Sequence, residues 1–254
     1  MKNKCLNKKT EKTLLNQKKF NKSGGIAKYI IYENNFLLKT LDLKDKDLIE
    51  FGCGIFPISI GLNKYKDLKS YTASDVSPKI IKKAKINDNR PNYIICDLEK
   101  KIKINKKFDV IILKGVLHHT KEPGKILIKL KKILKNNGFM VISEPNLSSI
   151  IGNFLKSLLR ICFKVSLEDS PYGQYDFKKI SQSIKRANLT IKNKWYSGLF
   201  IVILSGDYGR LKILPNYVWI CNIIIKIENI FFFLLKFTGV LKYLNFKINI
   251  VIQK

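Results

Sequence analysis

The residues best suited to chemistry each follow a short apolar run. Glu50-Phe51-Gly52-Cys53-Gly54 closes one run, Asp75 closes the next in "YTASDVSP", and Asp97 closes a third in "YIICDLEK". Glycines let bare backbone approach a ligand, and a carboxylate after the second strand can accept both hydroxyl groups of a ribose. Alone, such a turn or carboxylate is equally typical of a tight loop or a helix cap. The order of the three along the chain favours a nucleoside ligand.

Two adjacent histidines, His118 and His119, are the only ones in the chain, and they follow the apolar run "DVIILK". An imidazole titrates near neutral pH, so either could accept a proton from a substrate. The structural alternative is that one of them only packs against or caps the following turn. The five cysteines are widely spaced, without metal-ligand spacing, so we expect neither a disulfide scaffold nor a bound metal.

From Leu48 onward, short apolar runs alternate with longer helical patterns, which is typical of βαβ units on a parallel sheet. Helices are predicted at 122–138, where Pro123 suits the first turn and Gly138 ends the segment, and at 177–188. Strands are predicted at "LIEF", "YTAS", "YIIC", "DVIILK", "FMVIS", "LTIKNKWYS" and "NFKINIVIQK". The sequence thus predicts an α/β fold that brings the polar strand ends to one edge.

The charge is strongly positive, with 48 Lys and Arg against 19 Asp and Glu and a net charge of +29. Such a field attracts nucleic acid, anionic lipid surfaces or acidic substrates. Only four of these residues are arginine, the side chain that forks onto phosphates and guanine edges, so nucleic acid is not favoured as a partner. The alternative is that the lysines only cover solvated faces. With cysteines unpaired, we expect a reducing, cytoplasmic location.

Both ends of the chain differ from the middle. Residues 1–25 are rich in Lys and Asn and lack the apolar core of a signal peptide, so we expect a solvated, partly disordered basic arm. The tail 216–244 is apolar but is interrupted by Lys226, Glu228 and Lys236, which predicts a buried or surface-lying helix and leaves a peripheral membrane contact open. Its phenylalanines are interpreted as core, or as a lid over an apolar substrate: Phe231, Phe232, Phe233 and Phe237.

Taken together, these motifs resemble the class I S-adenosylmethionine-dependent methyltransferases, particularly the ubiquinone/menaquinone-type and related small-molecule enzymes. "LIEFGCG" is similar to the family's first motif, "SDVSPKIIKKAK" to its second and "CDLE" to its third. "FDVIILKGVLHHTKEPGKILIKLKKILKNNGFMVISEPN" resembles its fourth-strand to fifth-strand block. The resemblance covers about residues 45–146 and implies a doubly wound, mostly parallel, seven-stranded Rossmann-like sheet with an antiparallel last strand and a helical cap.

The resemblance also implies roles for individual residues around S-adenosyl-L-methionine. Asp75 would hold the ribose hydroxyl groups, Asp97 the adenine amino group, and Lys114 and Gly115 would border the sulfonium. The remaining implied contacts are Glu50, Gly52, Cys53 and Gly54 at the methionine and ribose part, and Val76 and Leu98 against adenine. Many members carry a third glycine where this chain has Phe56.

We therefore expect a basic arm at 1–25 and a single methyltransferase-like domain at 26–254, with a cofactor-binding core at 45–146. Cap and substrate elements are predicted at about 147–176 and 205–244. The function expected is methyl transfer to a small molecule, a lipid or a lipid-linked glycan. Two alternatives stay open: a non-catalytic module of the same fold bound to an anionic surface, and a nicotinamide oxidoreductase, which Pro57 disfavours because G-x-G-x-x-G requires glycine there.

Overall fold

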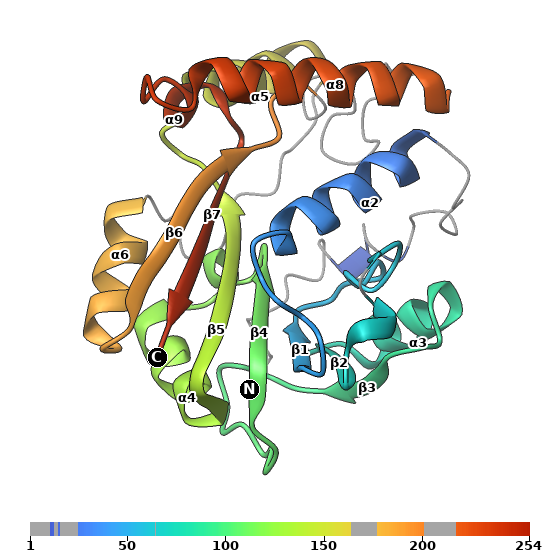
Figure 1. The fold of residues 1–254 in the computed structure, drawn as a ribbon, viewed down its shortest axis with the longest axis vertical. Helices are drawn as coiled ribbons and strands as arrows, with labels where there is room; N and C mark the ends of the chain where they lie inside the picture. The colour runs from blue at the N-terminus through green and yellow to red at the C-terminus, as the bar shows by residue number, and fades with distance from the viewer. Residues whose placement is uncertain (1–10, 13–14, 16–24, 64, 164–176, 201–216) are drawn as a thin grey trace.

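Seven strands form one sheet in the part of the chain that the computed structural model describes, residues 11–12, 15, 25–63, 65–163, 177–200 and 217–254. The strand order is β3-β2-β1-β4-β5-β7-β6, and β7 runs antiparallel to both of its neighbours while the other pairs are parallel (Figure 1). The strands are β1 (Asp47–Phe51), β2 (Ser70–Asp75), β3 (Asn92–Ile95), β4 (Phe108–Lys114), β5 (Leu134–Pro145), β6 (Thr190–Ser197) and β7 (Lys247–Gln253). The predicted α/β fold with its antiparallel last strand is confirmed.

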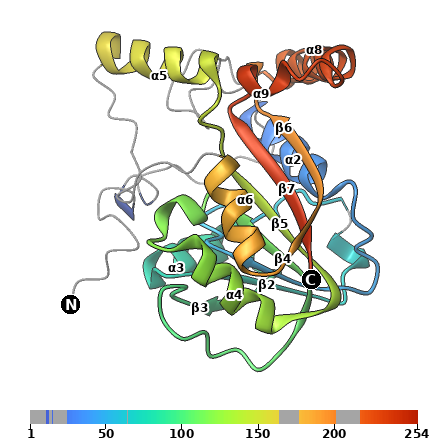
Figure 2. The ribbon, with the colours of Figure 1, turned by 90° about the vertical axis from the view of Figure 1, so that its left-hand side faces the viewer.

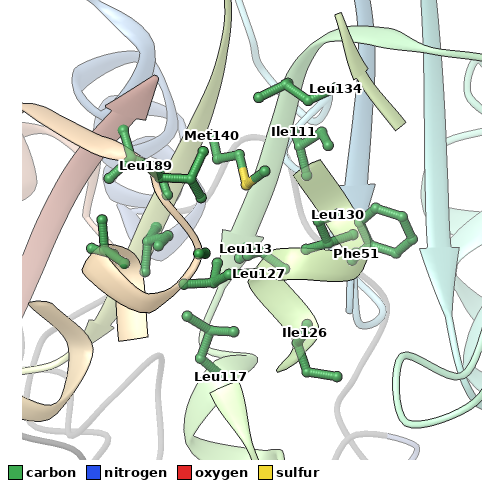
Figure 3. Packing of buried hydrophobic residues seen from close by; sticks show 14 of the residues in the cluster. Phe51, Ile111, Leu113, Leu117, Ile126, Leu127, Leu130, Leu134, Met140 and Leu189 are labelled. Atoms are coloured by element: carbon green, nitrogen blue, oxygen red, sulfur yellow. The ribbon is translucent and has the colours of Figure 1, made fainter. Parts of the chain in front are cut away.

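Helices cover both faces of this sheet because its buried strands present apolar side chains to both sides. Ile111 and Leu113 of β4 face one core, shown in Figure 3, whereas Val110 and Ile112 face the other. The first core is covered by α4 (Pro123–Ile133) and α6 (Phe177–Arg186), and the second by α2 (Gly25–Leu38) and α3 (Pro78–Asn87). The short 3-10 helices are η1 (Tyr65–Asp67) and η2 (Leu117–His119).

The strand order reverses direction between β1 and β4. From β1 the chain proceeds to β2 and β3 on one side, and from β4 it proceeds to β5 on the other. Connections that diverge in this way leave a crevice beyond the carboxyl ends of the two central strands, where ligands of open α/β sheets bind. Phe51 at the end of β1 pairs with Leu113 near the end of β4, so the glycine turn and the histidine segment leave the sheet side by side.

The predicted helix 122–138 ends earlier than its sequence pattern indicated. Helix α4 stops at Ile133, and Leu134 already pairs with Phe108 in the sheet. Gly138 therefore lies within β5 rather than at a helix end, and a Cβ there would lie 3.0 Å from the carbonyl oxygen of Asp109. The Gly138 prediction was wrong because pairing with β4, which a local pattern does not reveal, competes with the last helical turn.

A separate helical layer lies at the carboxyl ends of the parallel strands. It consists of α5 (Ile150–Phe163), α8 (Val218–Leu235) and α9 (Leu241–Leu244), which both views place at the same end of the molecule (Figures 1 and 2). The predicted cap elements 147–176 and 205–244 lie partly here and partly outside the described residues, as does most of the predicted arm 1–25. The interpretation of the tail phenylalanines as core was wrong for Phe233 and Phe237, which are 67% and 88% exposed.

Candidate active site

The turn after β1 depends on two glycines with positive φ. Gly52 has φ +68° and Gly54 has φ +59°, a backbone region that side chains with a Cβ rarely adopt. A Cβ on Gly52 would come within 2.5 Å of Val116 Cγ2, whereas a Cβ on Gly54 would meet no atom of the described residues within 4 Å. Gly52 therefore lets the turn pack against the β4 exit, and Gly54 borders open space at the crevice.

Glu50 and Cys53 hold this turn in place from inside the protein. The Glu50 carboxylate accepts hydrogen bonds from Ile58 N, at 2.9 Å, and from the Tyr71 hydroxyl, and the side chain is 2% exposed. The backbone N–H of Cys53 donates to Ser74 O, at 2.9 Å, and burial raises the pKa of its thiol well above the usual value. The Cys53 thiol donates to Gly54 O, at 3.4 Å, so both side chains have structural partners, and their predicted contacts with a cofactor stay predictions.

Asp75 lies directly beside the glycine turn. One carboxylate oxygen accepts from Gly54 N, at 3.1 Å, and the other from Ser77 N, at 3.0 Å. Burial raises the pKa of this carboxyl despite those N–H groups, and the carboxylate of Glu11 raises it further. The Glu11 side chain itself accepts a hydrogen bond from the Ser77 hydroxyl. Val76 follows as a half-buried apolar residue at the same rim.

Asp97 and Leu98 occupy the outer side of the same edge. The Asp97 carboxylate accepts from Glu99 N, at 3.0 Å, and lies 3.8 Å from Lys100 Nζ. Leu98 is 6% exposed and belongs to the core under α4. A surface groove of about 610 Å³ follows β3, and only its Asp97 end reaches the carboxyl edge of the sheet, so we do not regard the groove itself as the site.

Lys114 and Gly115 leave β4 in different directions. The Lys114 ammonium group donates to Asn34 Oδ1 of α2, at 2.8 Å, and lies 3.2 Å from Glu33 Oε2. Gly115 has φ +66°, donates its N–H to Ser143 O at 2.7 Å, and lies beside His118. The structure therefore holds Gly115 between the end of β5 and His118, while the Lys114 side chain is anchored on α2.

The end of β5 contributes a residue that the sequence analysis did not select. Glu144 is 3% exposed; its Oε1 accepts from Val116 N, at 2.9 Å, and from Leu117 N, at 2.8 Å, and its Oε2 lies 2.6 Å from His118 Nδ1. A buried carboxylate with these partners is an acceptor, so Nδ1 carries the proton and the lone pair of the neutral ring is on Nε2. This is the arrangement of an oriented general base.

His119 differs from its neighbour in electrostatics. The two rings lie 3.9 Å apart between centroids. Burial, followed by the proximity of His118, lowers the pKa of His119 to about 4, although Glu144 opposes this. His119 is therefore neutral at pH 7. Within the described part of the chain, no three His, Cys, Asp or Glu side chains are grouped so as to hold a metal ion.

Carboxylates at the opposite ends of the same strands behave differently. Asp47 and Asp109 lie at the amino ends of β1 and β4, where Lys135 Nζ approaches both, at 2.9 and 2.7 Å. Although burial opposes it, hydrogen bonds from lysines hold the pKa of both carboxyls below the usual value. At the carboxyl edge, by contrast, burial raises the pKa of Glu50 and Asp75. Carboxyl groups with a shifted pKa that lie in a crevice are typical of functional sites.

Comparison with known proteins supports this picture. A family model described as "Methyltransferase domain" matches residues 49–142, which span the turn after β1 through most of β5. The chain is 29% identical over 115 residues to the malonyl-[acyl-carrier protein] O-methyltransferase of Acetivibrio thermocellus, covering 43% of this chain and 40% of the relative. It is 28% identical over 158 residues to the mitochondrial ubiquinone biosynthesis O-methyltransferase of Schizosaccharomyces pombe, covering 59% and 55%.

These matches are partial, because the chain spans about half or less of the length of the curated relatives that it matches. The fold agrees over nearly the whole chain. The crystal structure of a magnesium protoporphyrin IX methyltransferase from Synechocystis PCC 6803, with bound SAH, superposes with a TM-score of 0.56 at 14% identity, covering 96% of this chain and 93% of that one.

Proposed function

We propose that this chain is a class I S-adenosylmethionine-dependent methyltransferase, whose methyltransferase-domain match spans residues 49–142, and that it transfers a methyl group from S-adenosylmethionine to a small, largely apolar acceptor. The observation that carries the proposal is the Gly54 turn, which is open to the crevice and bonded to Asp75. The superfamily binds S-adenosylmethionine at this edge of the sheet, so the residues found here should fit the nucleoside part of that cofactor.

The residues fit a nucleoside on two counts. First, a Cβ at Gly54 would occupy space that the described part of the chain leaves open, which is what a ligand lying over bare backbone requires. Second, a carboxylate offers about four acceptor positions. The Asp75 carboxylate is bonded to the backbone N–H groups of Gly54, Val76 and Ser77, so it retains capacity for a ribose hydroxyl group.

On this assignment, Asp75 and Val76 hold the ribose and one face of the adenine, Asp97 and Leu98 lie at the far end of the adenine, and Gly52, Gly54 and Gly115 let the backbone approach. When bound, the cofactor supplies a methyl group already activated by a positively charged sulfur, for in-line attack by the acceptor. Alignment and exclusion of water then supply most of the rate. The helical layer over this edge contributes to that exclusion.

His118 is the group proposed to take a proton from the acceptor. Glu144 fixes its ring through Nδ1, so Nε2 is the basic atom, and the backbone of Val116 and Leu117 fixes Glu144 in turn. A base is useful when the acceptor atom is a hydroxyl or an acid oxygen that must lose its proton. The two relatives described above are named as O-methyltransferases, which supports an oxygen acceptor here.

The acceptor class is proposed from what surrounds the crevice. Helices α5 and α8, in the layer at the carboxyl edge of the sheet (Figure 1), are mostly apolar, which favours a lipid-like molecule, or a lipid-linked glycan, over a highly charged acceptor. The non-catalytic alternative, a basic module of the same fold, draws support from Phe56 at the family's third glycine position and from the net charge of +29. Cofactor binding separates the two.

The test uses isothermal titration of the full chain with S-adenosylhomocysteine, and two alanine variants that are matched in backbone strain. Gly54 has φ +59° and Gly239 has φ +71°, and among the residues that the structure covers neither Cβ would meet an atom within 4 Å. Both variants should cost about 1 kcal/mol of stability through the strained φ. Gly54→Ala should also weaken binding about tenfold or more, because its methyl group occupies the ligand's place.

Gly239→Ala, in the turn after α8, should leave the affinity for S-adenosylhomocysteine at the wild-type value. No heat of binding to the folded wild-type chain at high micromolar ligand would contradict the proposed function and favour the non-catalytic alternative. Equal losses of affinity in the two variants would show that strain, not occupancy of the crevice, controls binding.

A further inference from the structure

Two helices of the layer at the carboxyl edge expose apolar side chains at the same spacing. In α5 these are Ile150, Phe154 and Ile161, which are 66%, 66% and 77% exposed; in α8 they are Trp219, Ile223 and Ile230, at 63%, 47% and 60%. Both sets are separated by four and then seven residues, so each lies along one face of its helix. We call these six residues the apolar platform.

The opposite faces of the two helices are already occupied. In α8 the buried residues are Cys221, Ile224 and Glu228, which are directed toward α2, where the Tyr32 hydroxyl donates to Asn229 Oδ1 at 2.7 Å. In α5 a Cβ on the buried Gly152 would lie 3.4 Å from Phe246. The platform residues are on the other sides of these helices, so the fold itself leaves them facing outward.

Both helices lie at the same end of the molecule. Figure 1 shows α8 along this end with α5 behind it, and Figure 2, turned by 90°, shows α5 in side view at the same level as α8. Exposed large apolar side chains that recur along one helix face in this way are typical of a surface that meets a partner or a membrane. Of the described helices, α8 alone is long and apolar enough to cross a membrane, but its packing on α2 holds it along the surface of the protein.

The charges that accompany the platform are positive. The only acidic residue of α8 is Glu228, which is 1% exposed on the α2 side, whereas Lys226 is exposed. Lys236, just after α8, lies 4.7 Å from the ring centroids of both Phe233 and Phe237. The sequence of α5 contains Lys156 and Arg160 and no acid. Lysines beside exposed Trp and Phe are the composition of helices that lie in the interface of an anionic membrane.

We propose that the apolar platform docks this protein on the surface of an anionic lipid bilayer, with α5 and α8 lying in the interface and the carboxyl edge of the sheet facing the membrane. Positive charge complements the lipid head groups, and the platform side chains replace contact with water by contact with acyl chains. The net charge of +29 directs the approach to such a surface. Because the platform requires no cofactor, the proposal is independent of methyl transfer.

Docking in this orientation has a consequence for the site. Helix α2 lies between α8 and the strand ends, since Asn34 and Glu33 of α2 contact Lys114 at the end of β4. In this orientation the membrane and the crevice lie on the same side of the sheet, so an acceptor held in the bilayer would be near the proposed site.

The experiment is flotation of the full chain with vesicles of phosphatidylcholine alone and of phosphatidylcholine mixed with phosphatidylglycerol. Two single substitutions are matched for exposure: Ile230→Asp in the platform and Ile86→Asp in α3, where the side chains are 60% and 62% exposed. The wild-type chain should float with the anionic vesicles and much less with the neutral ones. Ile230→Asp should reduce the bound fraction about tenfold, and Ile86→Asp should not.

Both substitutions are at exposed positions, so circular dichroism and S-adenosylhomocysteine titration should show an unchanged fold and an unchanged crevice. Failure of the wild-type chain to float with anionic vesicles would overturn the proposal, as would equal losses in the two variants. Binding that resists both high salt and alkaline carbonate would overturn it in favour of a spanning α8. A soluble dimer that Ile230→Asp dissociates would assign the platform to a second copy of the chain.

Discussion

Asp75 is the side chain on which the proposed cofactor site depends most directly. Its carboxylate is almost fully buried and bonded to the glycine turn through Gly54 N. Asp75→Ala should weaken the binding of S-adenosylhomocysteine by roughly 1–3 kcal/mol, because the ribose hydroxyl groups lose their acceptor in a buried place. Titration calorimetry measures this, with Asp67→Ala at the exposed end of η1 as the control. Unchanged affinity in Asp75→Ala would remove the ribose assignment.

Glu144 is a positioning residue for His118, and its loss should change the tautomer of the ring. In Glu144→Gln the amide can donate to Nδ1, which moves the ring proton to Nε2 and removes the basic lone pair from that atom. The ¹⁵N chemical shifts of the imidazole should report this exchange, and methyl transfer should fall about 10²–10⁴-fold with little change in cofactor affinity. His119→Asn, in the neighbouring ring, should leave the His118 tautomer unchanged. A wild-type shift pattern in Glu144→Gln would separate Glu144 from the base.

Some residues of the candidate site can be identified from the sequence alone, and others cannot. The glycine turn and Asp75 were found in the sequence because each stands at a fixed place after an apolar strand. Glu144 follows a similar rule, as the acid near the carboxyl end of β5, and the signal was available in "ISEPN". Its role was not visible, because a hydrogen bond across 26 positions to His118 depends on which strands are neighbours.

At the scale of elements, the packing of α8 on α2 is controlled by a buried carboxyl group. Glu228 accepts a hydrogen bond from Leu199 N at 2.8 Å through one oxygen, while its other oxygen has no hydrogen-bond partner among the described residues. Burial raises the pKa of Glu228 to about 7, against 4.5 for an exposed glutamate. The helix therefore packs most favourably when this group is protonated.

The sign of the pH dependence follows. Below pH 4.5 Glu228 is protonated in both the folded and the unfolded chain, so its contribution to the free energy of unfolding is complete. Between pH 4.5 and about 7 only the folded chain keeps the proton, and the free energy of unfolding falls as pH rises. Above about pH 7 the contribution is lost. Glu228→Gln should therefore raise the free energy of unfolding by up to about 3 kcal/mol at pH 8 and by little at pH 4. Urea denaturation at the two pH values measures it, and Glu122→Gln, on the surface, is the control. Equal effects at both pH values would exclude an ionisation effect.

The ends and buried faces of helices were predicted least reliably from local sequence patterns. Residues 134–138 carry a helical pattern, yet they form the start of β5, because Leu134 pairs with Phe108 and Gly138 packs against the backbone of β4. The α8 pattern predicted a buried or surface-lying helix; the structure buries one face and exposes the other, and which face is buried depends on the position of α2. The periodicity of a sequence shows which residues share a helix face, but only tertiary packing determines which element that face contacts.

At the scale of the whole molecule, the net charge of +29 should oppose folding through self-repulsion at low salt. Raising NaCl shortens the Debye length from about 10 Å at 0.1 M to about 3 Å at 1 M, which weakens this repulsion. The Tm should therefore rise by a few degrees over that range, because each kcal/mol of added stability raises the Tm of a chain of this size by about 2–4 °C. Differential scanning calorimetry measures the shift.

The double variant Lys79→Gln/Lys82→Gln, on the exposed side of α3, should show a smaller salt dependence and a higher Tm at low salt. A Tm that falls with added salt would show that attractive ion pairs, such as those of Lys135 with Asp47 and Asp109, outweigh the repulsion. The same salt range should weaken flotation with anionic vesicles, so the two measurements separate screening within the chain from screening of the membrane.

The sequence by itself determined the strands, their polar ends and the motifs that resemble a methyltransferase, because these depend on local periodicity and on residues at short, fixed spacings such as Glu50 to Gly54. Only the tertiary structure decided that Glu50 bonds Tyr71 and Ile58 inside the protein, that Lys114 turns to α2, and that Glu144 holds His118. It also decided that α5 and α8 present matching apolar faces at one end of the molecule. Each of these facts joins residues far apart in the chain, and such contacts are selected by the free energy of packing the whole fold, which no single segment encodes.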